Sequence, residues 1–353
     1  MDNSSKRIAW IDTLKFIGIF GVYICHFQAE AGYFYTFGFR FLAELFIFVS
    51  GAMEAISTIE LSLFDNIKRK FQSIILPYFF FCFISILIII FSGEATVNVL
   101  LKTSFQYLTG VRNTLFSPIL WFLPTLFVIS VIFILLKKLI KNRWLILLAG
   151  LVLFVISETL LSHHPLVEPS WYWNVDSAIY FFFYYTLGYA LFPYIVKLLS
   201  SNSRGTRLVV LISGAFAGAY ALAFLLGKDY IAIFLGQVPH SNPIISIASA
   251  IVLIWFSIFV SQTISSIELF QRIGRNTLYI LGSEQIIKHL TPTLFSIFGL
   301  NLKIESLSGV IIFTFLAFVA EIYLIVPFLK SFYKQILAFV IGPGRTQEKS
   351  QIG

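Results

Sequence analysis

The stretch IAWIDTLKFIGIFGVYICHFQ (8–28) decides the fold, because it is apolar and long enough to enter a bilayer yet carries Asp12, Lys15 and His26. At 100° per residue these three side chains lie within an arc of about 60° on one face of a helix. Ionisable side chains inside a membrane span are costly and usually face a protein interior or an aqueous cavity. The stretch therefore predicts a membrane helix with one functional face.

The composition excludes an ordinary soluble globule, since 58% of the 353 residues are hydrophobic and only 12% are charged. Ten apolar runs approach the ~20 residues that a hydrocarbon core of ~30 Å requires. The sequence predicts an all-α, polytopic membrane protein in the lipid bilayer. Its helices are expected at residues 9–29, 39–58, 73–92, 119–136, 143–161, 177–196, 208–226, 243–263, 275–297 and 308–329.

The Lys and Arg residues are distributed unequally between the two sides of this predicted bundle. Eighteen of them lie at the termini or in alternate loops, whereas six lie in the intervening loops. The positive-inside rule then places both termini in the cytoplasm. The net charge of +8 is mostly a topology signal, which argues against nucleic-acid binding. Residues 1–335 are expected to form the transmembrane domain, and residues 336–353 a short cytoplasmic tail.

Cysteine and histidine spacing gives no sign of a disulfide framework or a metal centre. Cys25 and Cys82 both lie inside apolar runs, and His163 and His164 are adjacent rather than helically spaced. No metal site is therefore predicted. An alternative for the first helix is a cleavable signal peptide, because a basic start, a short apolar core and an Ala-Glu-Ala tripeptide (29–31) occur in that order.

A series of short motifs carries a family resemblance. Asp12, a basic residue at position 15 and His26 are followed by LFIFVSGA (45–52), KRKFQSIILPYFFF (68–81), LWFLPTLF (120–127), FYYTLGYALFP (183–193) and IGRNTLYIL (273–281). In this order the motifs resemble those of the membrane-bound acyltransferase-3 family, and the resemblance covers most of the chain. Lys15 occupies a position where Arg is commoner in the family. In this respect the chain resembles the branch of the family that includes sugar O-acetylases.

This resemblance implies a membrane O-acyltransferase, most simply an O-acetyltransferase that uses acetyl-CoA as its acyl donor. The implied acceptor is a hydroxyl of a cell-envelope polysaccharide or a lipid-linked glycan, and the implied location is the plasma membrane, of the bacterial inner-membrane type. The chain departs from the family in its ninth predicted helix. Where many members carry a His, alignment through Thr277 and Leu278 places Glu284.

Helix geometry places the candidate catalytic groups His26, Glu44 and Glu284. At a rise of ~1.5 Å per residue, His26 lies about 25 Å from the cytoplasmic side and Glu44 about 7 Å below the outer face. At this shared level, Glu44 would orient the His26 imidazole as a base. Glu284, at a depth of ~15 Å, is expected to line the acyl or acceptor passage. The alternative for Glu284 is a local i,i+4 pair with Lys288.

The cytoplasmic side offers cations for the acyl donor. Lys68, Arg69 and Lys70 lie in one inner loop, and Lys15 lies slightly inside the same face. Arg and Lys bind phosphate by charge-assisted hydrogen bonds, so these four residues predict a site for the phosphates of acetyl-CoA. Basic residues at inner loops are also ordinary topological anchors. Asp12 and Lys15 are expected to pair at i,i+3.

Aromatic side chains are candidate contacts for the acceptor. Trp121 lies in the LWFLPTLF motif, and Trp171 and Trp173 lie in the outer loop HHPLVEPSWYWNVD (163–176). Aromatic faces with polar neighbours suit stacking against a glycan. Asp12 is likewise expected to contact the substrate. Trp and Tyr also form the ordinary belt at membrane interfaces, which is the alternative explanation.

A transporter or flippase is the alternative from another functional class. It predicts solute movement without consumption of acyl-CoA, whereas the transferase hypothesis predicts acyl transfer that depends on His26. A translocation path would be lined by the intramembrane charged side chains, which are Asp12, Lys15, Glu44, Glu158, Glu284 and Glu321.

Overall fold

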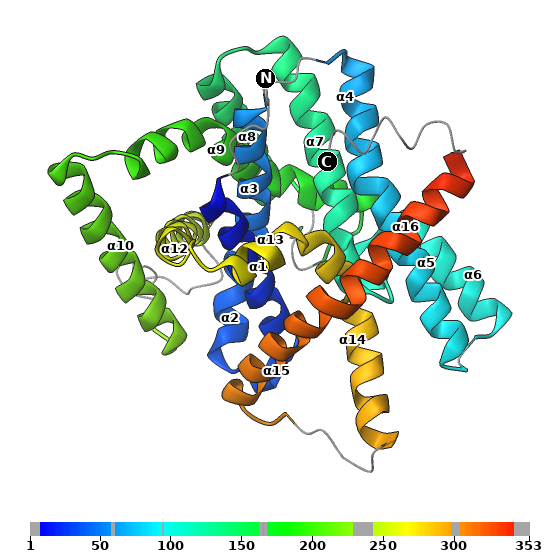
Figure 1. The fold of residues 1–353 in the computed structure, drawn as a ribbon. Coiled ribbons are helices and arrows are strands. Elements are labelled where there is room, and N and C mark those ends of the chain that lie inside the picture. Colours follow the sequence, from blue (N-terminus) through cyan, green and yellow to red (C-terminus); the bar gives the residue numbers. More distant parts are fainter. Residues whose placement is uncertain are drawn as a thin grey trace, which may run out of the picture.

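The computed structural model describes residues 8–57, 61–93, 95–161, 165, 168–228, 243–297 and 304–341. These residues form helices and no strand, which confirms the all-α prediction, and each of the ten predicted apolar runs contains a helix (Figure 1). The principal helices are α1 (Ala9–Cys25), α3 (Leu42–Ile56), α4 (Leu63–Lys70), α5 (Leu76–Phe91), α7 (Phe122–Leu139), α8 (Arg143–Thr159), α9 (Val175–Leu199), α10 (Arg204–Leu225), α12 (Pro243–Thr263), α14 (Thr277–Ile297), α15 (Leu307–Ala320) and α16 (Val326–Ile341).

Shorter elements connect these helices. They are α2 (Tyr33–Phe39), α6 (Val97–Thr109), α13 (Glu268–Arg275), the 3-10 turns η1 (Gln28–Ala31), η3 (Arg112–Thr114), η4 (Pro118–Trp121) and η5 (Tyr172–Asn174), and the π turns η2 (Phe71–Ile75) and η6 (Glu321–Ile325).

Within the described part of the chain, six helical runs are long and apolar enough to cross a membrane. They are Leu63–Phe91, Pro118–Leu139, Tyr172–Leu199, Arg204–Leu225, Pro243–Thr263 and Leu307–Ile336. The other four predicted spans coincide with α1, α3 and α8, which have 17, 15 and 17 residues, and with α14, which contains polar residues. Ten spans and cytoplasmic termini stay predictions. α16 continues past the predicted domain boundary to Ile341, and residues 342–353 lie outside the described residues.

Two of the long helices contain a π turn just before a proline. The turn η2 ends two residues before Pro77, and η6 ends two residues before Pro327. Proline has no N–H, and its ring crowds the carbonyl four residues earlier, so a wider turn relieves the clash without ending the helix. The second of these turns begins at Glu321, which is completely buried.

Close packing of α3 on α9 forms the centre of one hydrophobic core. A Cβ atom on Gly51 would collide with the backbone carbonyl of Tyr185, and one on Gly188 would collide with that of Phe48. Small residues let membrane helices approach to backbone contact. The LFIFVSGA and FYYTLGYALFP motifs, which are far apart in the sequence, therefore form a single helix–helix interface.

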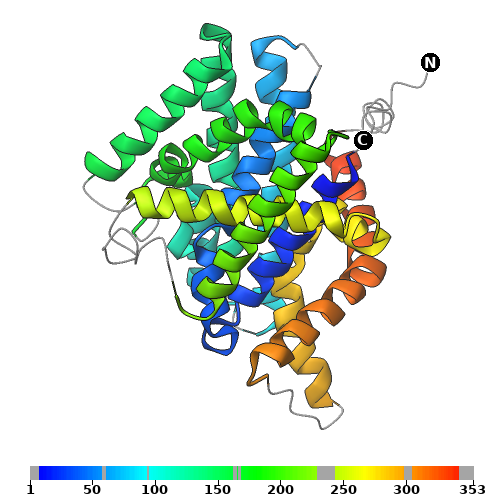
Figure 2. The ribbon, with the colours of Figure 1, turned by 90° about the vertical axis from the view of Figure 1, so that its left-hand side faces the viewer.

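The helix α1 lies between the two main hydrophobic cores. Its residues Ile11 and Leu14 belong to the core built on α3 and α9, whereas Phe16, Ile19 and Tyr23 belong to the core built on α5, α14 and α15. Figure 1 looks almost along α12, and Figure 2 shows α12 running across the bundle beside α1. The charged stripe of α1 is therefore enclosed by protein on several sides.

Candidate active site

His26 lies where α1 ends. The predicted helix continues to residue 29, but α1 stops at Cys25, and the His26 amide donates to the carbonyls of Val22 and Tyr23. Gln28 then adopts a φ of 49°, a conformation that ends the helix and turns the chain. The His26 side chain is 26% exposed, so its ring is accessible from one side.

The His26 ring contacts Glu284 of α14. Its Nδ1 atom is hydrogen-bonded to Oε1 of Glu284, although the two residues are 258 positions apart. The Glu284 side chain is only 2% exposed. A proton on Nδ1 donates to the carboxylate and leaves the lone pair on Nε2. This is the arrangement of an oriented base, because the carboxylate holds the tautomer and stabilises the imidazolium.

The structure corrects the predicted pairing of Glu44 with His26. The two glycines of α1 that touch α3 contact the side chains of Leu42 and Phe46. At 100° per residue, Glu44 points about 160° away from each of these residues on the helical wheel. Depth along a helix does not fix the rotation about its axis: Glu44 lies on the α9 side of α3, the side of Gly51, and Glu284 takes its predicted place beside His26.

Glu44 belongs to a separate buried cluster. It is 3% exposed, and the cations whose charges act on its carboxylate are Arg112 and Arg40. The Arg112 guanidinium lies over the Trp121 ring, 4.5 Å from its centroid. Burial lowers the pKa of Arg112 from its ordinary value, while the charge of Glu44 acts in the opposite direction. Glu44 therefore lies in the field of two cations and apart from His26.

A second carboxylate, which the sequence analysis assigned only to a transport path, lies next to the His26 pair. Glu321 Oε1 lies 2.5 Å from the Tyr23 hydroxyl and 2.7 Å from the Ser283 hydroxyl, each of which can donate to it. Tyr23 precedes His26 by one helical turn on α1, and Ser283 adjoins Glu284 on α14. Glu321 is therefore hydrogen-bonded to both of the helices that carry the pair. The sequence feature that could have identified Glu321 is a carboxylate shortly before a proline within an apolar helix.

The predicted pair of Asp12 and Lys15 is confirmed. Lys15 Nζ lies 3.6 Å from Asp12 Oδ1, and the two side chains are 27% and 5% exposed. The helix α13 covers α1 here, since Gly274 packs against the Asp12 carbonyl and Phe270 stacks on Phe16 with ring centroids 4.1 Å apart. Because Asp12 is buried under α13, its predicted contact with substrate stays a prediction.

The predicted donor cations lie at the end of α4. Lys70 forms a short ion pair with the buried Glu54 of α3, and Arg69 donates to the Asn66 side chain over 3.1 Å. The Lys68 side chain is exposed. Glu54 neutralises Lys70, so the predicted role of this cluster in donor binding depends mainly on Lys68 and Arg69.

The three predicted aromatic contacts lie in and around η4 and η5. Trp121 stacks on Phe181 with ring centroids 5.8 Å apart, and η4 packs against α14, the helix of Glu284. Trp173 donates through Nε1 to the Leu108 carbonyl over 2.9 Å, whereas Trp171 is 42% exposed. Of the three aromatic residues, Trp121 is thus the one whose element packs against the helix that carries Glu284.

Asn174 joins these aromatic turns, and no motif or spacing in the sequence marked it. Its Oδ1 accepts from the Arg112 amide over 2.8 Å, and its Nδ2 donates to the Gly110 carbonyl over 2.7 Å. The side chain is completely buried. His163 and His164, from the same predicted loop, lie outside the described residues. Among the described residues, no group of three or more His, Cys, Asp or Glu side chains could hold a metal ion.

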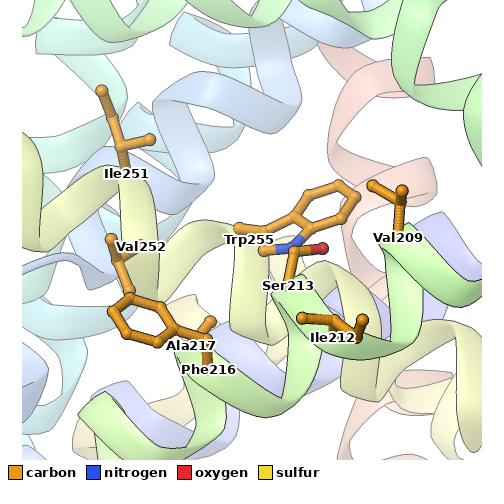
Figure 3. Close-up of a pocket in the computed structure, with 8 residues that line it drawn as sticks. All are labelled: Val209, Ile212, Ser213, Phe216, Ala217, Ile251, Val252 and Trp255. Carbon is orange, nitrogen blue, oxygen red and sulfur yellow. The ribbon is translucent and has the colours of Figure 1, made fainter.

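An apolar groove of about 520 Å³ lies between α10 and α12 (Figure 3). Trp255 donates from Nε1 to Ser213 Oγ over 3.2 Å within it. No titratable side chain lines the groove, so it offers no group for proton transfer. The lining residues are Val209, Ile212, Ser213, Phe216, Ala217, Ile251, Val252 and Trp255.

Comparison with known families and proteins gave one match. The sequence model of a family described as an acyltransferase domain matches residues 8–326. No curated protein and no solved structure matches the chain. The matched range contains His26, Glu284 and Glu321, together with all the motifs quoted above.

Proposed function

The chain belongs to the acyltransferase-3 family, and we propose that this membrane acyltransferase moves an acetyl group from cytoplasmic acetyl-CoA to a hydroxyl of a cell-envelope glycan or a lipid-linked saccharide. The observation that carries the proposal is the His26–Glu284 pair, in which a buried carboxylate holds a partly exposed imidazole. The proposed location is the plasma membrane, of the bacterial inner-membrane type, where such acceptors are available.

In this proposal His26 acts as a general base through Nε2. It takes the proton of the acceptor hydroxyl while the oxygen attacks the carbonyl carbon of the thioester. When the tetrahedral intermediate collapses, the C–S bond breaks and the leaving thiolate of coenzyme A takes the proton from the imidazolium. Glu284 stabilises the imidazolium between these two proton transfers. The products are an O-acetyl ester and free coenzyme A.

The helix α1 connects the proposed donor and acceptor sides. Lys15 and His26 are about 16 Å apart along a helix axis, at ~1.5 Å per residue. The phosphates of acetyl-CoA would bind near Lys15, Lys68 and Arg69, with the thioester arm reaching along α1 to His26. Trp121, with Arg112 on its ring, is the proposed aromatic contact for the acceptor.

Transfer of labelled acetyl tests the proposal directly. Membranes containing the unaltered protein, His26→Ala or Tyr194→Phe, at matched abundance, are incubated with labelled acetyl-CoA and envelope glycan. Tyr194 is half-exposed on α9, packs on Trp144 and has no part in the mechanism. Loss of a general base predicts about 10²- to 10⁴-fold slower transfer for His26→Ala, and Tyr194→Phe is expected to retain activity.

Two results would contradict the proposal at different points. Transfer that survives His26→Ala keeps the transferase but removes His26 as its base. Absence of transfer from every acyl donor, combined with saccharide movement across sealed vesicles, would favour the transporter alternative.

A further inference from the structure

The helix α14 packs against α13 and against the continuous helix α15–η6–α16 (Figures 1 and 2), and four cations lie on α13 and α16 in this region. Lys330 on α16 lies within electrostatic range of Lys334 on the same helix and of Arg272 and Arg275 on α13. Arg275 and Lys334 are exposed, whereas Arg272 and Lys330 are half-buried. The cluster therefore combines residues about 60 positions apart in the sequence, and sequence spacing gave no sign of it.

Aromatic rings hold two of these cations in place. The Arg272 guanidinium lies 4.6 Å from the centroid of the Tyr323 ring in η6, and Lys330 Nζ lies 5.4 Å from that of Tyr279 in α14. Cation–π contacts of this kind stabilise a side-chain position without neutralising its charge. Asn276 donates to the Arg272 carbonyl over 2.7 Å and closes the turn between α13 and α14.

Among the described residues, no ion pair joins Arg272, Arg275, Lys330 or Lys334 to a carboxylate. Like charges held together repel one another, and an anion between them removes the repulsion. Lys70, by contrast, is neutralised by Glu54. A group of preplaced cations without carboxylates is the arrangement that binds phosphate.

We propose that Arg272, Arg275, Lys330 and Lys334 form a binding site for a ligand that carries several phosphate charges. If the proposed function holds, on which this step rests, the ligand is the phosphate-bearing end of acetyl-CoA. The helix α13 supports this source, because it packs on α1 at Asp12 and Phe16, at the end of α1 opposite His26. An anionic phospholipid headgroup presents the same phosphate chemistry and is the other source.

Direct binding to the purified full-length protein tests the site. The probes are coenzyme A and its adenosine bisphosphate fragment, and the protein is held in nanodiscs of phosphatidylcholine alone. Arg275→Gln combined with Lys330→Gln is expected to raise the Kd of both probes at least about tenfold, since it removes charge-assisted hydrogen bonds. Arg275→Lys combined with Lys330→Arg retains the charges and should recover most of the affinity. Lys138→Gln combined with Lys141→Gln, at one exposed cation in the last turn of α7 and one just beyond it, should leave the Kd unchanged.

The two sources give different outcomes. An unchanged Kd for both probes in the neutralised variant would overturn the assignment to acetyl-CoA. If, in addition, the neutralised variant binds phosphatidylglycerol as tightly as the unaltered protein does, the proposal of a phosphate site is itself overturned. If it loses phosphatidylglycerol but not coenzyme A, the site holds a lipid headgroup instead. Binding needs no transfer, so coenzyme A binding without acetyl transfer would contradict the proposed function and leave this site standing.

Discussion

The two ends of α1 differ in how their charges are balanced. At the His26 end the imidazole pairs with Glu284, and Glu321 accepts hydrogen bonds from Tyr23 and Ser283. At the Lys15 end, Lys330 of α16 lies within electrostatic range of Lys334, Arg272 and Arg275, and in the described part of the chain no ion pair joins these cations to a carboxylate. In the proposals made here, the paired site transfers a proton and the cluster of like charges binds an anionic ligand.

Substitutions at the two ends of α1 should also affect the stability of the protein differently. Removing one partner of a buried ion pair leaves an uncompensated charge and is strongly destabilising. Removing one of several like charges relieves repulsion and costs little. Substitutions at the His26 end should therefore change both stability and turnover, and those at the Lys15 end should change mainly the affinity for the donor.

Glu284→Gln is expected to have the largest effect among the following tests. The amide cannot stabilise the imidazolium, so kcat should fall about 100-fold, with KM for acetyl-CoA unchanged. The measurement is steady-state acetyl transfer by protein at matched abundance. Glu305→Gln, the same change at an exposed position, is the control. Equal kcat in the two variants would remove Glu284 from the mechanism.

Ionic strength should separate the two ends of α1. Raising salt from ~0.05 M to ~0.5 M shortens the screening length several-fold and weakens exposed phosphate contacts more than buried pairs. We expect KM for acetyl-CoA to rise several-fold while kcat stays nearly constant. A fall in kcat at constant KM would reverse the proposed division between binding and chemistry.

Tyr23→Phe should weaken the His26 end without removing its base. The change leaves Glu321 buried with one hydrogen bond fewer, which costs about 1–3 kcal/mol of stability. A lower unfolding temperature in detergent and a modest loss of kcat are expected.

Glu321→Gln, which keeps an acceptor oxygen, should retain more activity than Glu321→Ala. If the two are equally inactive, Glu321 has a role beyond holding α1 to α14.

Lys15→Met is expected to have the smallest effect. It removes the partner of Asp12 from an i,i+3 pair that is partly exposed, and such pairs contribute little. We expect about a twofold rise in KM for acetyl-CoA if Lys15 assists the donor. Lys138→Met, at an exposed position on α7, provides the baseline. A rise of tenfold or more would make Lys15 a principal phosphate contact, comparable with the cluster on α13 and α16.

The local features were predictable from the sequence because they depend on neighbours along the chain. Apolar runs determined the helices, and an i,i+3 spacing determined the pair of Asp12 and Lys15. The motif around Gly51 also stood out, but its partner did not: only packing shows that it meets Gly188 of α9.

The partners of buried charges were decided by tertiary structure. Helix depth placed Glu44 level with His26, yet rotation of α3 about its axis points Glu44 toward α9. The packing of α14 against α1 brings Glu284 to His26 instead. The sequence by itself determined the all-α membrane architecture and the charged stripe on α1, because hydropathy and periodicity are local properties. Which carboxylate holds the imidazole, and which cations gather at the other end, follows from helix rotation and contact between distant segments, which only the packed structure decides.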